Sequence, residues 1–156
     1  MIGGWQWNGI VTATGGFPIT PLSGSNTSGT GDINQSDTPN WYPDFKGPVI
    51  LGGRNQWFDP HAFKLPIQGT FGNVSRGSLR GPGLTKVDTS FFKKIPVSEK
   101  VSMQLRMEAF NIFNHANYVF PSQIVFAGTN YSSSAGAISY TAPPARQIQF
   151  ALKLMF

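Results

Sequence analysis

The residues of this chain that could carry out chemistry are few and far apart. The two histidines, His61 and His115, have no second ligand at a spacing such as His-x3-His, which a zinc site would need. The absence of cysteine excludes disulfide frameworks, Cys-based zinc sites and thiol catalysis. With only seven acidic residues and no evident Ser–His–acid set, a hydrolase has little support. We therefore expect no catalytic residue, no cofactor, no metal site and no enzymatic activity, and a structural hydrogen-bonding role for His115.

Two other segments contain residues of the kind that bind ions. Asp32 to Asp37 places several oxygen ligands close together, but it lacks the glycine and the distal glutamate of a calcium loop. The glycine-rich segment 72–77 lacks both the Lys-Ser/Thr ending and the strand–helix context of a phosphate-binding loop. We interpret the first segment as a polar surface loop and the second as a segment that shapes the path of the chain.

Aromatic residues in the polar, glycine-rich stretches offer a different kind of binding site. Their rings could stack on a ligand such as a sugar or a siderophore. The alternative, which we prefer, is that they pack the loops or sit in an interfacial girdle. The candidates for ligand contact are Trp41, Tyr42, Trp57 and Tyr131.

The composition is unusual for a soluble domain. Charged residues make up 12 % of the chain, whereas about 25 % is usual, and glycine (18) and proline (12) are abundant. The net charge of +5 is spread along the sequence, with two adjacent basic residues only at Lys93-Lys94. A nucleic-acid binder would interleave basic and aromatic residues on one face, so we expect no nucleic-acid partner. The N-terminus lacks the features of a signal peptide, and no stretch approaches the ~18 apolar residues of a membrane helix.

Alternating apolar and polar residues predict four long strands, over residues 5–14, 85–95, 100–111 and 146–156. A tight turn at 96–99 connects the middle two strands, because proline at its start presets a turn. Long segments over 15–84 and 112–145 are broken by glycine, proline and asparagine, and we expect them to form loops. Within the first loop, we expect short helical turns near residues 55–63 and no sheet.

Strand length favours a membrane barrel. About 10–11 residues are enough for a tilted strand to cross a membrane, whereas strands of soluble sandwiches usually have about 5–6. The apolar face of the last two strands would then face lipid, while Arg106, Glu108, Gln149 and Lys153 point into a wet lumen. The expected lipid-facing residues are Val101, Met103, Leu105, Met107, Ile148, Phe150, Leu152 and Leu154.

The connections alternate between long, short and long, as they do in membrane barrels with long extracellular loops and short periplasmic turns. We therefore expect an all-β fold, an antiparallel meander of about four long strands from the C-terminal end of a transmembrane β-barrel with two long extracellular loops. Four strands cannot close a barrel, since the smallest have eight. We expect the chain to be part of a longer protein or to require partner strands.

Three segments resemble the C-terminal region of the large Oar-like TonB-dependent transporters. They are the stretch from Phe71 to Gly83 followed by Val87 to Lys93; the stretch from Leu105 to Tyr118, which matches the family pattern R-x-E-x-F-N-x-F-N-H-x-N; and the ending from Pro144 to Phe156. The resemblance covers about residues 5–156. The first two are fairly specific, whereas a terminal alternating strand that ends in phenylalanine is common to many outer-membrane proteins.

The resemblance implies that residues 1–156 are the C-terminal part of a TonB-dependent receptor barrel in the bacterial outer membrane, without its plug and N-terminal regions. The partners implied are outer-membrane lipid, the remaining strands and plug of the full-length receptor, and TonB only through the missing N-terminal part. The barrel-assembly machinery would read the terminal strand as its signal, at Phe150, Leu152, Leu154 and Phe156. The function implied is uptake of an unidentified ligand.

Two alternatives remain open. A soluble, secreted β-sandwich that binds carbohydrate would show the same alternation, with the apolar faces buried in a core. A β-rich glycosidase would need a pair of catalytic carboxylates. The exposure of Ile148, Phe150, Leu152 and Leu154 distinguishes the sandwich from the barrel, because only the barrel leaves them uncovered by the chain's own atoms.

Overall fold

The computed structural model describes residues 3–34 and 37–156, and this part of the chain consists almost entirely of strands and their connections. No helix in the described residues is long and apolar enough to cross a membrane. The four long strands are β1 (Trp5–Thr14), β6 (Leu84–Pro96), β7 (Ser102–Phe110) and β10 (Gln147–Met155).

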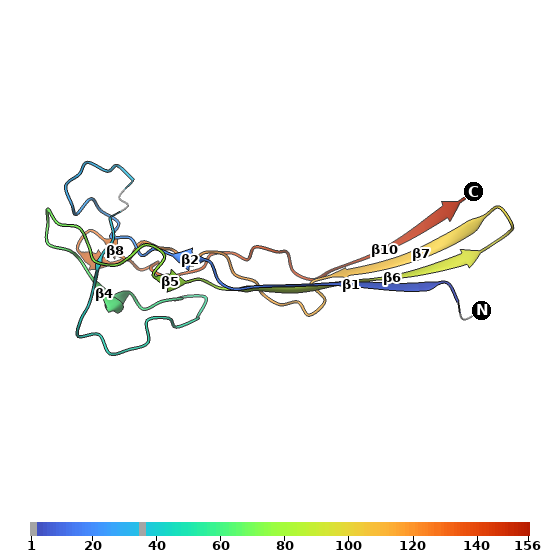
Figure 1. Cartoon of the computed structure of the whole chain (residues 1–156), viewed down its shortest axis with the longest axis horizontal. Coiled ribbons are helices and arrows are strands. Elements are labelled where there is room, and N and C mark those ends of the chain that lie inside the picture. Colours follow the sequence, from blue (N-terminus) through green and yellow to red (C-terminus); the bar gives the residue numbers. More distant parts are fainter. Residues whose placement is uncertain (1–2, 35–36) are drawn as a thin grey trace. The chain divides into compact units, whose positions relative to one another are not determined.

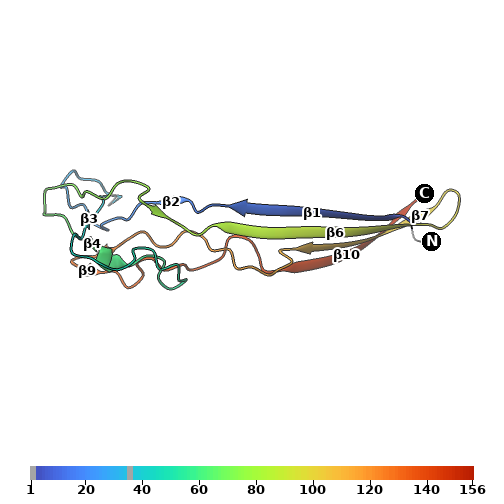
Figure 2. The ribbon, with the colours of Figure 1, turned by 60° about the horizontal axis from the view of Figure 1, so that its bottom comes forward.

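The four long strands form one antiparallel sheet in the order β1-β6-β7-β10. Each strand therefore lies beside the long strand that precedes it along the chain, which is a meander. The start of β1, the end of β10 and the β6–β7 turn lie at the same end of this sheet (Figure 1). Figure 2 shows the same strand order from a second direction. The predicted fold class, an all-β meander of about four long strands, is confirmed.

The strand bounds agree closely with expectation, and β1 has the predicted limits. The largest difference is at the start of β7, which begins at Ser102 and not at residue 100. Val101 belongs to the turn, where its carbonyl oxygen accepts hydrogen bonds from the amides of Val97 (2.9 Å) and Ser98 (3.0 Å). The expectation that Val101 lies on the strand was wrong, because the turn uses its carbonyl to close.

The chain divides into two compact units, which are described separately. The first contains residues 1–14, 84–117 and 141–156, and so includes the four-stranded sheet. The second contains residues 15–83 and 118–140, that is, most of the two long connections. Its elements are η1 (Pro60–Ala62) and the short strands β2 (Pro18–Ile19), β3 (Asn40–Trp41), β4 (Phe63–Lys64), β5 (Leu79–Arg80), β8 (Phe126–Ala127) and β9 (Asn130–Tyr131).

The second unit has a hydrophobic core of its own. The predicted helical turn is present as η1, but the prediction that the first loop contains no sheet was wrong. β2 pairs with β5, and β3 pairs with β4. The β3–β4 pair forms because Trp41 and Phe63 lie opposite each other, with ring centroids 4.9 Å apart. The core residues are Ile19, Phe58, Ala62, Phe63, Val74, Leu79, Val125 and Phe126.

The two long connections are hydrogen-bonded to each other within this unit. The amide of Leu22 donates to the carbonyl of Gln123, and the amide of Val125 donates to the carbonyl of Leu22, both at 2.9 Å. The amide of Trp57 donates to the carbonyl of Gly136 at 2.7 Å. Because their backbone groups pair with one another, the two connections fold as one body.

Asp37 organises the polar segment that had been considered as an ion site. Its carboxylate accepts hydrogen bonds from the Ser28 amide (2.7 Å), the Ser28 hydroxyl (3.1 Å) and the Thr27 hydroxyl (3.2 Å). The Ser28 amide in particular lowers the pKa of Asp37, against the opposing effect of burial. Gln35 and Ser36, which belong to the same segment, lie outside the described residues. The described bonds of Asp37 are those of a loop-stabilising residue.

Candidate functional site

The register of the long sheet sorts its residues onto two faces. Residues directly opposite each other on paired strands project to the same side, and successive residues alternate. One face is apolar across all four strands. Its rows, from the β6–β7 turn onward, are Ile95, Met103 and Leu154; Trp5, Lys93, Leu105 and Leu152; Trp7, Phe91, Met107 and Phe150; and Gly9, Thr89, Ala109 and Ile148.

This apolar face is exposed. On β10, Ile148, Phe150, Leu152 and Leu154 have exposed fractions of 52, 76, 60 and 53 %. Contiguous apolar surface of this extent is rare on soluble monomers and marks an interaction surface. A soluble sandwich would bury these side chains in its own core, whereas the described chain leaves them uncovered. The apolar face therefore requires an external apolar partner.

The opposite face is polar. Glu108 forms an ion pair with the Nε of Arg106 at 3.0 Å and accepts a short hydrogen bond from the side-chain amide of Gln149. The Arg106 guanidinium also lies 4.6 Å from the ring centroid of Phe92, which is buried beneath it. Cation–π contact and ion pairing together hold the guanidinium in place. This division into one apolar and one polar face suits a sheet between hydrocarbon and water.

Aromatic residues on the apolar face extend it across β1 and β6. Trp7 stacks on Phe91 with ring centroids 6.3 Å apart. The indole N–H of Trp7 donates to the hydroxyl of Thr89 at 2.6 Å. A buried or lipid-covered indole N–H needs such a partner, because no water is available to accept its hydrogen bond.

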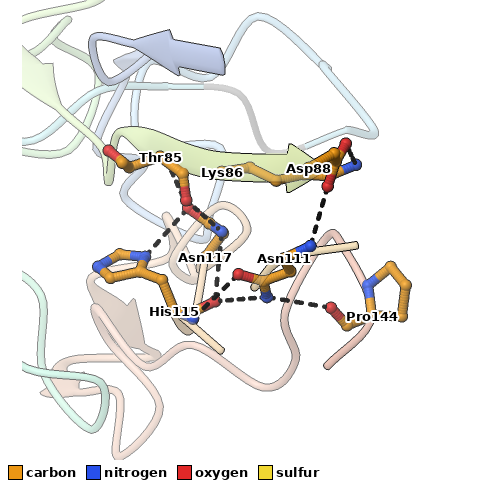
Figure 3. Close-up of polar contacts among 7 residues, drawn as sticks. All are labelled: Thr85, Lys86, Asp88, Asn111, His115, Asn117 and Pro144. Carbon is orange, nitrogen blue, oxygen red and sulfur yellow. Dashed lines mark hydrogen bonds and ion pairs between the residues drawn. The ribbon is translucent and has the colours of Figure 1, made fainter. Parts of the chain in front are cut away.

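Asparagine side chains replace strand pairing where β7 ends. Asn111 has a φ of 50°, in the left-handed region that asparagine tolerates better than most residues. Its amide donates to the carboxylate of Asp88 (2.9 Å), which also pairs with Lys86 (2.8 Å). Its side chain binds both the amide (3.0 Å) and the carbonyl (3.0 Å) of His115 and reaches the carbonyl of Pro144 at 3.3 Å. Figure 3 shows Asn111 at the centre of these contacts.

Asn117 extends the same network onto β6. Its side-chain oxygen accepts from the Thr85 amide at 2.6 Å, and its side-chain nitrogen donates to the Thr85 carbonyl at 2.9 Å. The side chain thus satisfies both backbone groups of Thr85, as a neighbouring strand would (Figure 3). Asn117 is buried, so the loss of its amide would leave Thr85 with unpaired backbone groups.

The four candidate ligand-contacting aromatics occupy different environments. Trp41 and Trp57 are partly buried against the core of the loop unit, and the Trp57 indole donates to the Arg80 carbonyl at 2.8 Å. Tyr131 donates its hydroxyl to the Phe63 carbonyl at 3.0 Å. Tyr42 is exposed. Packing against the core accounts for the positions of the two tryptophans. Tyr42 differs from the other three candidates, because its side chain makes no hydrogen bond and stacks on no ring within the described part of the chain.

Tyr131 lies between two other rings. Its centroid is 4.6 Å from that of His61 and 5.0 Å from that of Phe126. Burial raises the pKa of Tyr131, and the nearby Tyr42 and Asp59 raise it further. Tyr131 is nevertheless exposed, so it differs from Tyr42 in its neighbouring rings and its bonded hydroxyl and not in its access to solvent.

Neither histidine is placed as a metal ligand in the described structure. His61 Nδ1 lies 2.8 Å from a carboxylate oxygen of Asp59, at the start of η1. His115 Nδ1 lies 3.3 Å from the side-chain oxygen of Asn117. Among the described residues no three His, Asp or Glu side chains are close enough together to hold a metal ion. The hydrogen bonds of His115 are consistent with the structural role expected for it.

The model of one protein family, described as "Outer membrane beta barrel domain", matches residues 1–149. The chain belongs to this family. Comparison with curated proteins and with solved structures gave no match. The family membership identifies the described sheet as part of an outer-membrane β-barrel and places the protein in the bacterial outer membrane.

In such a barrel the apolar face of the wall meets hydrocarbon and the polar face meets the lumen. The lipid-facing residues predicted from the sequence lie on β7 and β10 and do not include Trp5, Trp7 and Phe91, although these three residues also lie in segments where apolar and polar residues alternate. The roles of Asn111 and Asn117 were not predicted from the sequence. The sequence feature that could have revealed this role is the recurrence of asparagine just beyond a strand, where backbone groups lose their partners.

Replacing Phe150 by lysine tests which face of this outer-membrane barrel meets lipid. We expect Phe150→Lys to reduce the free energy of unfolding in the membrane by about 2–4 kcal/mol, since a lysine on the lipid face near the midplane carries that cost. Its neighbour Gln149 lies on the polar face, so Gln149→Lys is the matched control and should be tolerated. Urea unfolding in vesicles measures both, and equal destabilisation by the two lysines would contradict the assignment of faces.

Replacing Asn117 by alanine tests whether its amide acts as a substitute strand. Asn117→Ala leaves the amide and carbonyl of Thr85 without their partner, and we expect a loss of about 1–3 kcal/mol in the free energy of unfolding. Hydrogen exchange at the Thr85 amide should accelerate in parallel. Asn130→Ala, in the exposed β8–β9 hairpin, is the control. Unchanged exchange at Thr85 in Asn117→Ala would show that the amide pairing is dispensable.

Proposed function

We propose that this chain forms part of the wall and the extracellular loops of a TonB-dependent transporter that takes up a scarce ligand. The observation that carries the proposal is the combination of a long two-faced sheet with a folded loop unit that has its own core. The resemblance of residues 71–93 and 105–118 to Oar-like transporters supports it. Asn111, Asn117 and His115, which belong to the second of these segments, form the network where β7 ends.

The connections of the sheet suggest its orientation. β6 and β7 are joined by the short turn 97–101, while β1–β6 and β7–β10 are joined through the long loops. Outer-membrane barrels have short periplasmic turns and long extracellular loops. On this basis β1 and β7 run outward, β6 and β10 run inward, and both long loops lie outside the cell.

The edges of the sheet support a larger barrel. β1 pairs with β6 alone and β10 with β7 alone, so each has one row of backbone groups without a partner strand in the described chain. In hydrocarbon each unsatisfied group costs several kcal/mol, so further strands must lie beside both edges. We propose that the remaining strands of a full-length receptor supply them and that its plug lies against the polar face around Glu108.

The loop unit is the proposed ligand-facing part. Its core holds the loops in one conformation before a ligand arrives, which reduces the entropy lost on binding. Of the aromatic candidates Tyr42 presents its side chain to solvent, whereas Trp41 and Trp57 are engaged in packing. The role proposed is binding and not catalysis, because Glu108 and Asp88 are tied to Arg106 and Lys86 as structural ion pairs.

Two further interactions follow from the resemblance. The terminal strand residues Phe150, Leu152, Leu154 and Phe156 would be read by the barrel-assembly machinery during insertion. TonB would act through an N-terminal part of the receptor and not through the residues described.

Labelling of single cysteines tests the proposed orientation. The chain has no native cysteine, and Ser98 in the short turn and Ser133 in the second long loop are both exposed. A membrane-impermeant maleimide should label Ser133→Cys in intact cells, and should label Ser98→Cys only after the outer membrane is permeabilised. Labelling of Ser98→Cys in intact cells would reverse the assignment of sides.

Energy dependence tests the transport proposal. Cells that carry the full-length protein should accumulate at least one member of a panel of labelled ferric siderophores and oligosaccharides, and the accumulation should cease when TonB is removed. A variant with Tyr42→Ala should bind the same compound more weakly, while Tyr140→Ala, another exposed loop tyrosine, serves as control. Accumulation that persists unchanged without TonB would contradict the proposal and leave the barrel assignment intact.

A further inference from the structure

Lys93 is an exception on the apolar face of the sheet. Among the residues that β1, β6, β7 and β10 contribute to this face, all of which are described, it carries the single formal charge. It lies opposite Trp5 and Leu105, one row from the row of Ile95 that borders the turn. The charge is therefore close to one end of the apolar band, where it is far less costly than at the midplane.

The ammonium group of Lys93 is directed toward the end of the apolar band that borders the β6–β7 turn. Its Nζ donates to the carbonyl of Gly3 at 2.7 Å, and Gly3 precedes the start of β1. The same Nζ lies 4.7 Å from the centroid of the Trp5 ring. A lysine ammonium has three N–H donors, so the contact with Gly3 leaves two for another acceptor.

Two hollows meet at Lys93. An apolar groove of about 380 Å³ on the lipid-facing surface is lined by Trp5, Phe91, Lys93, Leu105, Met107 and Phe150, among others. A second hollow of about 580 Å³, at the end of the strands, is lined by Gly3, Gly4, Lys93, Lys94, Ile95 and Pro96. Both hollows offer almost entirely apolar surface, and the second also places the cation beside glycines that have no side chains to fill the space.

We propose that Lys93 and Trp5 form a binding site for the phosphate of a glycerophospholipid in the periplasmic leaflet. The phosphate accepts from the free N–H groups of Lys93 in the hollow at Gly3 and Gly4. One acyl chain lies in the groove between Trp5 and Phe150. The occupant follows from charge complementarity, since an anionic phosphate pairs with the ammonium, and from an apolar groove that continues directly from it.

The choice of leaflet rests on the proposed orientation, in which the turn after Pro96 faces the periplasm. Indole rings and lysines concentrate at membrane–water interfaces because the ring tolerates both phases and the ammonium reaches the headgroups. A bound phosphate also gives the residual N–H groups of Lys93 the partners that hydrocarbon cannot provide. The site thus explains why a cation is tolerated on this face.

Spin-labelled lipids test the site in the assembled full-length protein, purified from the outer membrane and returned to vesicles. The probes are phosphatidylglycerol and an uncharged diacylglycerol with the same labelled chain. We expect Lys93→Met to reduce the preference for phosphatidylglycerol in the motionally restricted lipid shell about fivefold, the effect of one basic residue near a membrane surface. Lys93→Arg should retain the preference. Lys153→Met, which removes a lysine from the polar face, is the control.

The outcomes separate the site from the proposed function. Equal preference in wild type, Lys93→Met and Lys153→Met would overturn the lipid site while leaving the transporter proposal untouched. Stronger retention of spin-labelled lipid A than of phosphatidylglycerol would overturn the assignment to the periplasmic leaflet. Labelling of Ser98→Cys from outside intact cells would overturn both the orientation and the leaflet.

Discussion

Backbone hydrogen bonding in a medium without water is the constraint on which the rest of this structure depends. A strand in hydrocarbon can satisfy its amides and carbonyls only through neighbouring strands. β6 and β7 have a partner on each side, and their pairing fixes the register of all four strands. Because the register is fixed, residues opposite one another share a face. A polar pair such as Glu108 and Gln149 could reach the lipid side only through a one-residue shift in register, which would move all the other side chains of the strand to the opposite face as well.

The constraint becomes hardest to meet where strands end and the chain turns irregular. Here side-chain amides substitute for peptide groups. Asn117 pairs with both backbone groups of Thr85, and Asn111 binds both backbone groups of His115. An asparagine carries the same donor and acceptor as a peptide unit, so it can extend a ladder without a further strand. The motif at 111–117 is therefore explained by hydrogen-bond satisfaction, with no need for a ligand.

The sequence alone predicted the strands well because alternation is a local property. The faces of β7 and β10 follow from every second residue, and Val101 was misplaced only because turn closure depends on carbonyl positions that alternation does not encode. The contacts within and between the long loops could not be predicted in this way. Trp41 meets Phe63, and Leu22 meets Val125, across separations that no local pattern records. Their contacts arise from burial of scattered apolar residues, which leaves no period in the sequence.

The buried loop core changes what the surface aromatics can do. In an unfolded loop Trp41, Tyr42, Trp57 and Tyr131 would be equivalent as ligand contacts. In the folded unit Trp41 and Trp57 pack against the core, and Tyr131 is held by Phe63 and its neighbouring rings. The packing of Trp41 against the core fixes the adjacent backbone that presents Tyr42. Ligand recognition on such a surface depends on a few exposed side chains in fixed positions. The core that positions these side chains therefore determines ligand selectivity as much as the side chains themselves do.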